Sequence, residues 1–477
     1  MSSFPCHARI LFGAALLASA PLPAAFAADA KTPSISARTG PADLQQMRDE
    51  IRALKSDYET RIQALEKRLE RAEHANEQLQ QQQQAAAPAP APAPVASASA
   101  ASGSAFNPKI SLILDGGYAD YSVNHREPEV PGFLLGDETE LRSRGMSLGE
   151  TELAIEANVD QSFHAWTTLS VAPDGGIGVE EAYLNTLGLP DGFSVKFGRF
   201  FSDIGYQNHQ HAHAWEFVDA PLVYRAMLGT QLGDDGIQLR WLAPTDTFFE
   251  VGTELLRGDA FPAGGEGRNG IKAITGFAHL GGDAGLSGSW RLGLSHLRAD
   301  ANRRPTGDDD DAGAVSFDGK SDLTILDGVY KWSPNGNATV RNAVIQGEYF
   351  FRHERGDLVF DPDGAADTST YRGDQQGFYL QGVYQFMPRW RVGLRYDRLF
   401  ADNEVSNVVA DTPLELIADD GGRDPDRWSL MTDFSNSEFS RFRLQFSLDD
   451  SRPNHDQDRQ VFLQYIFSLG PHPAHQF

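Results

Sequence analysis

The sequence predicts an all-β protein, a transmembrane antiparallel β-barrel of about sixteen strands preceded by an N-terminal coiled-coil helix. Three observations lead to this fold class. The chain opens with an export signal. Beyond Phe106 no apolar stretch reaches about 18 residues, so no spanning helix is expected there. Instead, apolar and polar residues alternate over segments of about ten residues, the length of a tilted strand that crosses a bilayer.

The chain is expected to consist of five consecutive segments that differ in composition. They are a signal peptide at 1–27, a short N-terminal segment at 28–42, a periplasmic coiled coil at 43–80, a Gln/Ala/Pro-rich linker at 81–106 and the barrel at 107–477.

The signal peptide is predicted from three features. Arg9 supplies a positive charge, residues 10–18 form a short apolar core, and residues 25–27 match a small-x-small cleavage site. An uncleaved anchor is the alternative. Cleavage removes Cys6, the one cysteine of the sequence, so the exported protein is expected to lack disulfides, zinc–thiolate sites and a thiol nucleophile.

Apolar residues recur at spacings of three and four between Leu44 and Leu79, which predicts the coiled coil. One apolar strip cannot bury itself, so we expect a partner helix, most simply the same helix of a sister subunit. A solvated spacer helix is the alternative. The Gln run and Ala-Pro repeats that follow predict a semi-extended tether without a core.

The charge balance excludes one class of partner. The chain carries 41 Lys and Arg residues against 66 Asp and Glu residues, and its net charge is −25 at pH 7. Nucleic acid is not expected to bind, because its phosphates need a basic surface.

The alternating segments also predict a topology. The predicted strands lie near 108–120, 147–157, 162–172, 177–187, 193–201, 236–243, 247–257, 270–281, 288–300, 319–333, 341–354, 375–386, 389–401, 427–434, 438–449 and 460–469. An even number of strands with a periplasmic N-terminus puts the short turns on the periplasmic side and the long loops outside, the known asymmetry of such barrels. The predicted outer loops are 122–146, 202–235, 258–269, 301–318, 355–374 and 402–426.

A barrel of about sixteen strands encloses an aqueous lumen, whereas eight strands would fill it with side chains. The charged residues predicted to face this lumen mix both signs. They are Glu150, Glu152, Glu156, Lys196, Arg240, Glu250, Glu254, Glu348, Arg391, Arg395, Asp397, Arg441 and Arg443. Acidic outer loops, including residues 308–311, concentrate cations at a pore mouth, which favours cation preference.

The third outer loop is the longest one and holds the candidate constriction. Its candidate residues are His209, His211, His213, Glu216, Asp219 and Arg225. In an extended segment the three histidines face the same way, so their imidazoles are expected to converge. Neutral imidazole binds Zn²⁺, Cu²⁺ or Ni²⁺, and Glu216 or Asp219 could complete the site. Any Zn²⁺ is expected to be transient, with no permanent cofactor. The alternative is a polar, hydrogen-bonded loop packed on the barrel wall.

An N-terminal coiled coil, a tether and a sixteen-strand barrel resemble the phosphate-selective porin O/P type. The runs that carry the resemblance are Glu181-Ala182-Tyr183-Leu184-Asn185, Gly198-Arg199-Phe200 and Asp235-Gly236-Ile237-Gln238-Leu239, around the third loop. The resemblance implies an outer-membrane porin whose third loop sets the constriction. It does not extend to phosphate, since that family is expected to carry a basic ladder in the lumen. The third loop also resembles, less closely, uncharacterised outer-membrane proteins linked to bacterial zinc supply.

The predicted function is passive, charge-filtered diffusion of small hydrophilic solutes or ions through a homotrimeric porin in the outer membrane of a Gram-negative bacterium. Membrane lipid and small solutes are the expected partners, and cations are preferred. The alternatives are a zinc-linked uptake channel that uses the histidines, a TonB-dependent-like receptor and a structural outer-membrane anchor. An enzyme is not expected, because His353 beside Glu348 and His296 beside Ser295 are only fragments of a catalytic set.

Overall fold

The structure is a computed structural model that describes residues 108–123, 130–136, 141–172, 175–265, 270–306, 315–360, 366–408, 422–452 and 457–470. The chain divides into two units, 1–99 and 100–477, and all the described residues belong to the second. The expected signal peptide, N-terminal segment, coiled coil and linker therefore lie outside the described residues, and so does the acidic run 308–311. None of the helices in the described ranges is long and apolar enough to cross a bilayer.

Strands make up most of the described chain. They are β1 (Lys109–Tyr121), β2 (Gly145–Leu148), β3 (Thr151–Asn158), β4 (Phe163–Val171), β5 (Ile177–Thr186), β6 (Phe193–Phe201), β7 (Gly233–Leu242), β8 (Phe248–Leu256), β9 (Ala273–Ala284), β10 (Gly288–Thr306), β11 (Val315–Trp332), β12 (Asn342–Phe360), β13 (Asp367–Met387), β14 (Trp390–Ser406), β15 (Asp426–Ser437), β16 (Ser440–Asp450) and β17 (Asp458–Leu469). The helices are η1 (Pro190–Gly192), η2 (Ala212–Ala214), α2 (Leu222–Leu228) and η3 (Pro334–Gly336).

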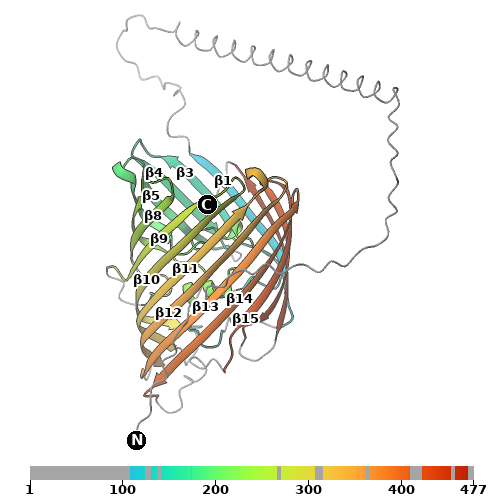
Figure 1. Cartoon of the computed structure of the whole chain (residues 1–477). Coiled ribbons are helices and arrows are strands. Elements are labelled where there is room, and N and C mark those ends of the chain that lie inside the picture. Colours follow the sequence, from blue (N-terminus) through green and yellow to red (C-terminus); the bar gives the residue numbers. More distant parts are fainter. Residues whose placement is uncertain are drawn as a thin grey trace, which may run out of the picture. The chain divides into compact units, whose positions relative to one another are not determined.

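The strands close into one antiparallel barrel (Figure 1). The last strand pairs with the first, with Leu469 opposite Leu112. Strands β2 and β3 both pair with β1, where Leu148 lies opposite Gly116 and Leu153 lies opposite Leu112. These two strands are therefore one barrel position interrupted at Gly149, and the 17 strands occupy sixteen positions. The predicted all-β barrel and its strand number are confirmed.

The barrel is apolar outside and charged inside, the reverse of a soluble protein. On β14, Leu394 is 49% exposed, whereas its neighbour Arg395 is 1% exposed. Aromatic side chains pair on the outer surface, as in Tyr396 with Trp428, whose ring centroids are 4.4 Å apart. An apolar outer surface flanked by aromatic residues is the surface that β-barrels present to lipid.

The strands β10 to β14 extend further than the sequence predicts. They are 17 to 21 residues long, whereas β3 to β8 are 8 to 10 residues long. Parts of the predicted outer loops 301–318, 355–374 and 402–426 are therefore strand. The sequence prediction limited each strand to the length that crosses a bilayer. Backbone pairing continues beyond that length, as in Val315 opposite Phe360.

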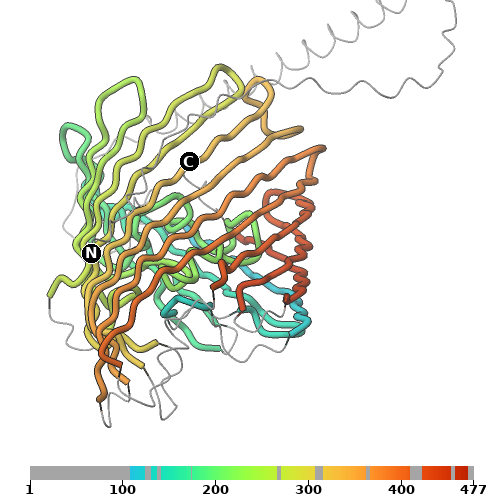
Figure 2. Tube along the Cα trace, turned by 60° about the horizontal axis from the view of Figure 1, so that its bottom comes forward, coloured from blue at the N-terminus to red at the C-terminus, as the bar shows by residue number. Residues whose placement is uncertain are grey.

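The third loop, residues 202–232, folds into the barrel and fills part of the lumen. Figure 2 shows this green segment inside the barrel wall. All seven residues of α2 are buried. The helix ends at Gly229, whose φ of 59° lies in the left-handed region that glycine adopts without strain. Leu222, Val223 and Leu228 belong to a core cluster with Phe350, Tyr379 and Leu399 of the wall, which fixes the loop on β12 to β14.

Candidate functional site

A buried carboxylate on β12 holds the start of the third loop and helix α2 together. Glu348 is 3% exposed. It accepts hydrogen bonds from the backbone N–H of Tyr206 at 3.1 Å, the backbone N–H of Gln207 at 3.0 Å and the hydroxyl of Tyr379 at 2.7 Å. The hydroxyl of Tyr224 on α2 donates to the same carboxylate at 2.9 Å. Glu348 thus faces the lumen as predicted, but its acceptors are occupied by the loop.

Ion pairs join the loop segment before α2 to β14 and β15. Asp219 pairs with Arg395 at 3.0 Å and also with Arg427, and it accepts a hydrogen bond from Gln445 at 3.0 Å. Burial alone would raise the pKa of Asp219, but the guanidinium groups of Arg427 and Arg395 hold that pKa well below its usual range. Arg225 of α2 is buried nearby, at 7% exposure.

Other predicted lumen arginines also bind the loop. Arg391 pairs with Glu216 at 2.8 Å. Arg441 donates to the carbonyl of His213 at 2.6 Å, and Arg443 donates to the carbonyl of Trp215 at 3.0 Å. These charges were predicted to face the lumen, and in the structure the loop inside the barrel supplies their partners. The wall from β12 to β16 is bonded to the loop along its length.

Two cavities lie on the opposite side, between the loop and the inner face of the shorter strands. The inner cavity has a volume of about 300 Å³ and is lined by β1 and β3 to β7 together with the loop, toward the short turns. The outer cavity has a volume of about 600 Å³ and lies toward the long loops. Phe201 lines both cavities. Glu150 lines the outer cavity, and Glu156, Lys196 and Arg240 line the inner one.

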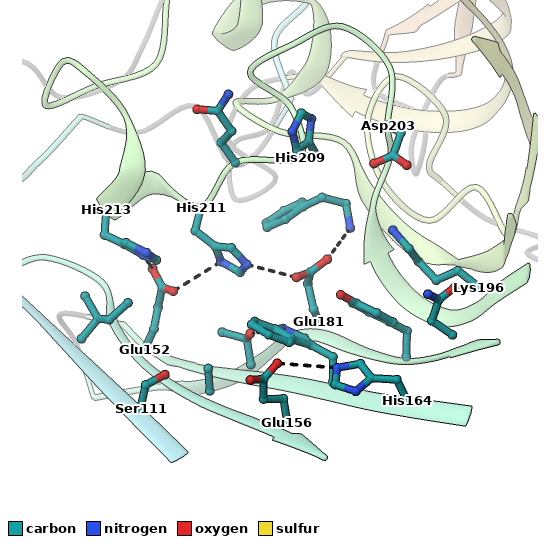
Figure 3. Close-up of a pocket in the computed structure, with 18 of the residues that line it drawn as sticks. Ser111, Glu152, Glu156, His164, Glu181, Lys196, Asp203, His209, His211 and His213 are labelled. Atoms are coloured by element: carbon teal, nitrogen blue, oxygen red, sulfur yellow. Dashed lines mark hydrogen bonds and ion pairs between the residues drawn. The ribbon is translucent and has the colours of Figure 1, made fainter. Parts of the chain in front are cut away.

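His211 lines the inner cavity, and its imidazole lies close to three glutamates, of which Figure 3 shows Glu152 and Glu181. Its Nδ1 lies 3.1 Å from a carboxylate oxygen of Glu180 and 3.3 Å from one of Glu152. Its Nε2 lies 3.0 Å from Glu181. The ring of His213 stacks on that of His211 at 5.6 Å, and its Nδ1 lies 2.7 Å from Glu152. The sequence predicted Glu152 as lumen-facing, but it did not single out Glu180 or Glu181 as site residues.

A β-bulge explains how two consecutive glutamates reach one histidine. Thr168 of β4 lies opposite Glu181, and the next residue, Leu169, lies opposite Val179. Glu180 is therefore the extra residue of β5, and the bulge turns it toward the same side as Glu181. Two adjacent charged residues within an alternating strand are the sequence signal of this bulge.

The predicted convergence of all three histidines is wrong. His209 lies apart and packs edge-on against Tyr206, with ring centroids 6.1 Å apart. The segment is not extended, since Gln210 donates its backbone N–H to Gln207 and η2 follows. Alternation of side chains applies only to strands. Glu216 and Asp219 do not join the histidines either, because they pair with arginines.

The pKa values of His211 and His209 are shifted in opposite directions. Burial alone would lower the pKa of His211, but its hydrogen bonds to Glu152, Glu180 and Glu181 raise that pKa well above its usual value. Burial lowers the pKa of His209 to about 4, although Asp203 acts against this shift. A positive charge is thus favoured at His211 and disfavoured at His209.

The remaining predicted lumen residues face inward and have partners. Glu156 pairs with Lys109 at 2.7 Å and Glu250 lies 3.3 Å from His279. Glu254 accepts the backbone N–H of Asp203 at 2.9 Å. No simple sequence pattern predicts these contacts, because they join one strand to another strand or to the loop. Asp397 accepts the backbone N–H of Leu222 at 3.0 Å.

The two histidines weighed as catalytic fragments lie elsewhere. His353 contacts Asp374, and His296 lies 3.0 Å from the hydroxyl of Thr324. Neither contact involves the glutamate or serine that the sequence places beside it.

Solved structures with related barrels were found. OmpT, an outer membrane protein of Vibrio cholerae, is 10% identical with a TM-score of 0.45, and the match covers 76% of this chain and 99% of that chain. The outer membrane channel DcaP of Acinetobacter baumannii is 14% identical with a TM-score of 0.45, and the match covers 76% of this chain and 96% of that chain. An anion-selective porin from Comamonas acidovorans is 11% identical with a TM-score of 0.42, and the match covers 76% of this chain and 99% of that chain.

No family model matches the chain. A protein of Aquifex aeolicus (strain VF5), described as uncharacterized, is 33% identical over 404 residues, which cover 79% of this chain and 81% of the relative. At this identity and coverage, the chain belongs to the same family as that Aquifex aeolicus protein.

Proposed function

We propose that the protein is an outer-membrane channel for passive diffusion of small hydrophilic solutes. The observation that carries the proposal is a closed barrel of sixteen positions with an apolar exterior, a charged interior and a third loop that leaves two cavities against β3 to β7. Closed barrels satisfy every backbone hydrogen bond in lipid, and this size encloses more space than its own side chains fill.

The diffusion path runs between the third loop and the wall of β3 to β7. The two cavities lie there, and on this side the loop contacts the wall through His211 and His213. On the other side, ion pairs and hydrogen bonds to arginines join the loop to β14 and β16. Glu150, Glu152, Glu180 and Glu181 line this path. Carboxylates that line a pore attract cations and repel anions, so we propose a cation preference.

The assembly and location are part of the same proposal. We propose a homotrimer in the outer membrane of a Gram-negative bacterium, in agreement with the coiled coil expected from the sequence. A phosphate-selective path is not proposed, because the constriction is acidic. A TonB-dependent receptor is not favoured either, since such transporters have about 22 strands and this barrel has sixteen positions.

Liposome swelling with sugars of increasing size tests the diffusion path. A path that widens to cavities of about 300 and 600 Å³ should admit small monosaccharides and exclude larger oligosaccharides. Liposomes without protein are the control. Swelling that does not depend on solute size contradicts a filter at the third loop. No swelling with any sugar or ion favours the structural anchor.

A second candidate function is passage of a transition-metal cation. It is favoured by one observation, that donor atoms of Glu152, His211 and His213 all lie within 4.8 Å of one another. Micromolar ZnCl₂ should then reduce potassium conductance, because a bound metal ion occupies the shared path. Conductance that is insensitive to Zn²⁺ contradicts this candidate and leaves the general channel untouched.

A further inference from the structure

We propose that Glu152, His211 and His213 form a binding site for one divalent transition-metal cation of the Zn²⁺ class, in the lining of the inner cavity. The carboxylate of Glu180 is available as a fourth ligand. The role of this site in permeation rests on the proposed channel function, but the binding itself does not.

The spacing of the donor atoms suits such an ion. Zn²⁺ binds imidazole nitrogen and carboxylate oxygen at about 2.0–2.2 Å, which places tetrahedral ligands about 3.4 Å apart. In the site, Nδ1 of His213 lies 2.7 Å from one oxygen of Glu152, and Nδ1 of His211 lies 3.3 Å from the other. Nδ1 of His211 lies 3.1 Å from Glu180. Small side-chain rotations would bring all four groups around one ion.

The arrangement also supplies the outer contacts that metal-binding histidines have. Such a histidine commonly donates its second ring nitrogen to a carboxylate, which fixes the ring orientation. Nε2 of His211 lies 3.0 Å from Glu181, and Glu181 is itself held by the backbone N–H of Phe201 at 3.0 Å. Arg441 holds the carbonyl of His213 at 2.6 Å. The imidazole of His211 and the backbone of His213 are thus positioned from outside the site.

The charges of the site favour a cation. Among the described residues, the ion pairs of Glu152, Glu180 and Glu181 are all with histidines rather than with lysine or arginine. By contrast, the acidic groups farther along the loop are neutralised by arginines. Two imidazoles with carboxylates suit Zn²⁺, Cu²⁺ or Ni²⁺, whereas Mg²⁺ and Ca²⁺ prefer oxygen ligands only.

Equilibrium dialysis of the untagged, refolded chain against ZnCl₂ tests the site, with bound metal measured by elemental analysis. We expect Glu152→Gln and His213→Ala to weaken the binding of one Zn²⁺ per chain by at least about tenfold, because even the loss of an outer contact to a metal ligand typically costs about 10–100-fold in affinity. His209→Ala is the matched control, because it removes an imidazole of the same loop that lies outside the site. Excess Mg²⁺ should not displace Zn²⁺.

Co²⁺ provides an independent readout of the ligand geometry. Wild-type protein loaded with Co²⁺ should show the visible absorption of a four-coordinate ion, and His213→Ala should lose it while His209→Ala keeps it. Heat-dependent gel mobility confirms that each variant has a folded barrel, and His213→Gln replaces His213→Ala if the latter fails to fold. Equal Zn²⁺ binding by wild type, Glu152→Gln and the folded His213 variant overturns the proposal, as does an equal loss in His209→Ala.

Bilayer conductance of the same preparations separates this proposal from the channel function. Site-dependent Zn²⁺ binding without conductance steps supports the site and refutes the channel. Conductance steps with no site-dependent Zn²⁺ binding refute the site and support the channel.

Discussion

Glu348 shows how single buried residues determine the position of the third loop. It accepts two backbone N–H groups and two tyrosine hydroxyls in the interior of the barrel. Gly205, with φ of 68°, lies directly beside the carboxylate, where a Cβ would collide with it. A missing acceptor would leave all four donors unsatisfied, at a cost of about 1–3 kcal/mol each.

Glu348→Ala is therefore expected to release the loop from β12. The variant should show larger and noisier conductance steps than wild type, together with faster proteolysis within residues 202–232. Glu404→Ala, which removes an exposed carboxylate of β14, is the control. Unchanged conductance and proteolysis in folded Glu348→Ala barrels would contradict this anchoring role.

His211 gives the loop a pH dependence. Its pKa is raised above the usual value of 6.5, so its contribution to loop docking is fully present below pH 6.5 and is lost as the pH rises through the raised value. Hydrogen exchange of residues 208–216 should accelerate at alkaline pH more in wild type than in His211→Gln, each compared at matched pH. Identical pH profiles of the two proteins argue against a charged His211.

At this scale the sequence predicted which residues belong to the site better than how they meet. Glu152, His211 and His213 were all among the candidates. Alternation along β3 identified Glu152 as a residue of the inner face, and the cluster of histidines identified the loop residues. The loop backbone follows no such period, so the separation of His209 and the pairing of Glu216 with Arg391 could not be derived. Those contacts depend on residues far apart in the sequence.

At the scale of elements, alternation located all sixteen barrel positions. The strand ends differ mainly where β10 to β14 continue beyond the length that lipid requires. The bulge in β5 was also missed, since an extra residue leaves most of the alternation intact. Its consequence is large, because it adds Glu180 to the site.

Deleting Glu180 should therefore be tolerated. The deletion joins Val179 to Glu181 and leaves a regular ladder opposite Leu169 and Thr168. Deleting Ala278 from β9, whose ladders with β8 and β10 have no register shift, is the control, since it shifts the rest of that strand by one residue and turns His279 toward lipid. We expect heat-modifiable, folded barrels only for the first deletion. Failure of both, or folding of both, contradicts this account of the bulge.

The whole molecule is organised by its lipid-facing surface. On β13 the outward residues are Phe378, Leu380 and Tyr384 in the middle, but Thr370 and Arg372 in the extension. The belt of outward apolar residues thus ends before the ends of the long strands, and the parts of these strands beyond it lie outside the lipid. This arrangement follows from the sequence, because lipid constrains every outward residue at the same height.

Charge introduced into the belt should destabilise the barrel. Leu394→Arg on β14 is expected to cost about 2–4 kcal/mol if it lies near the bilayer centre, measured by reversible unfolding in vesicles. Thr370→Arg, outward but in the extension of β13, should cost much less. Equal destabilisation by the two substitutions would contradict the position of the belt.

The central claim is that cations pass between the third loop and the wall of β3 to β7. Its most direct test is the reversal potential of the refolded protein in planar bilayers under a steep KCl gradient. We predict a cation-selective potential that falls toward zero in the double variant Glu180→Gln/Glu181→Gln and is unchanged in Asp322→Asn, on the outer face of β11. An absence of conductance steps, or an anion-selective potential that ignores both glutamates, would contradict the account.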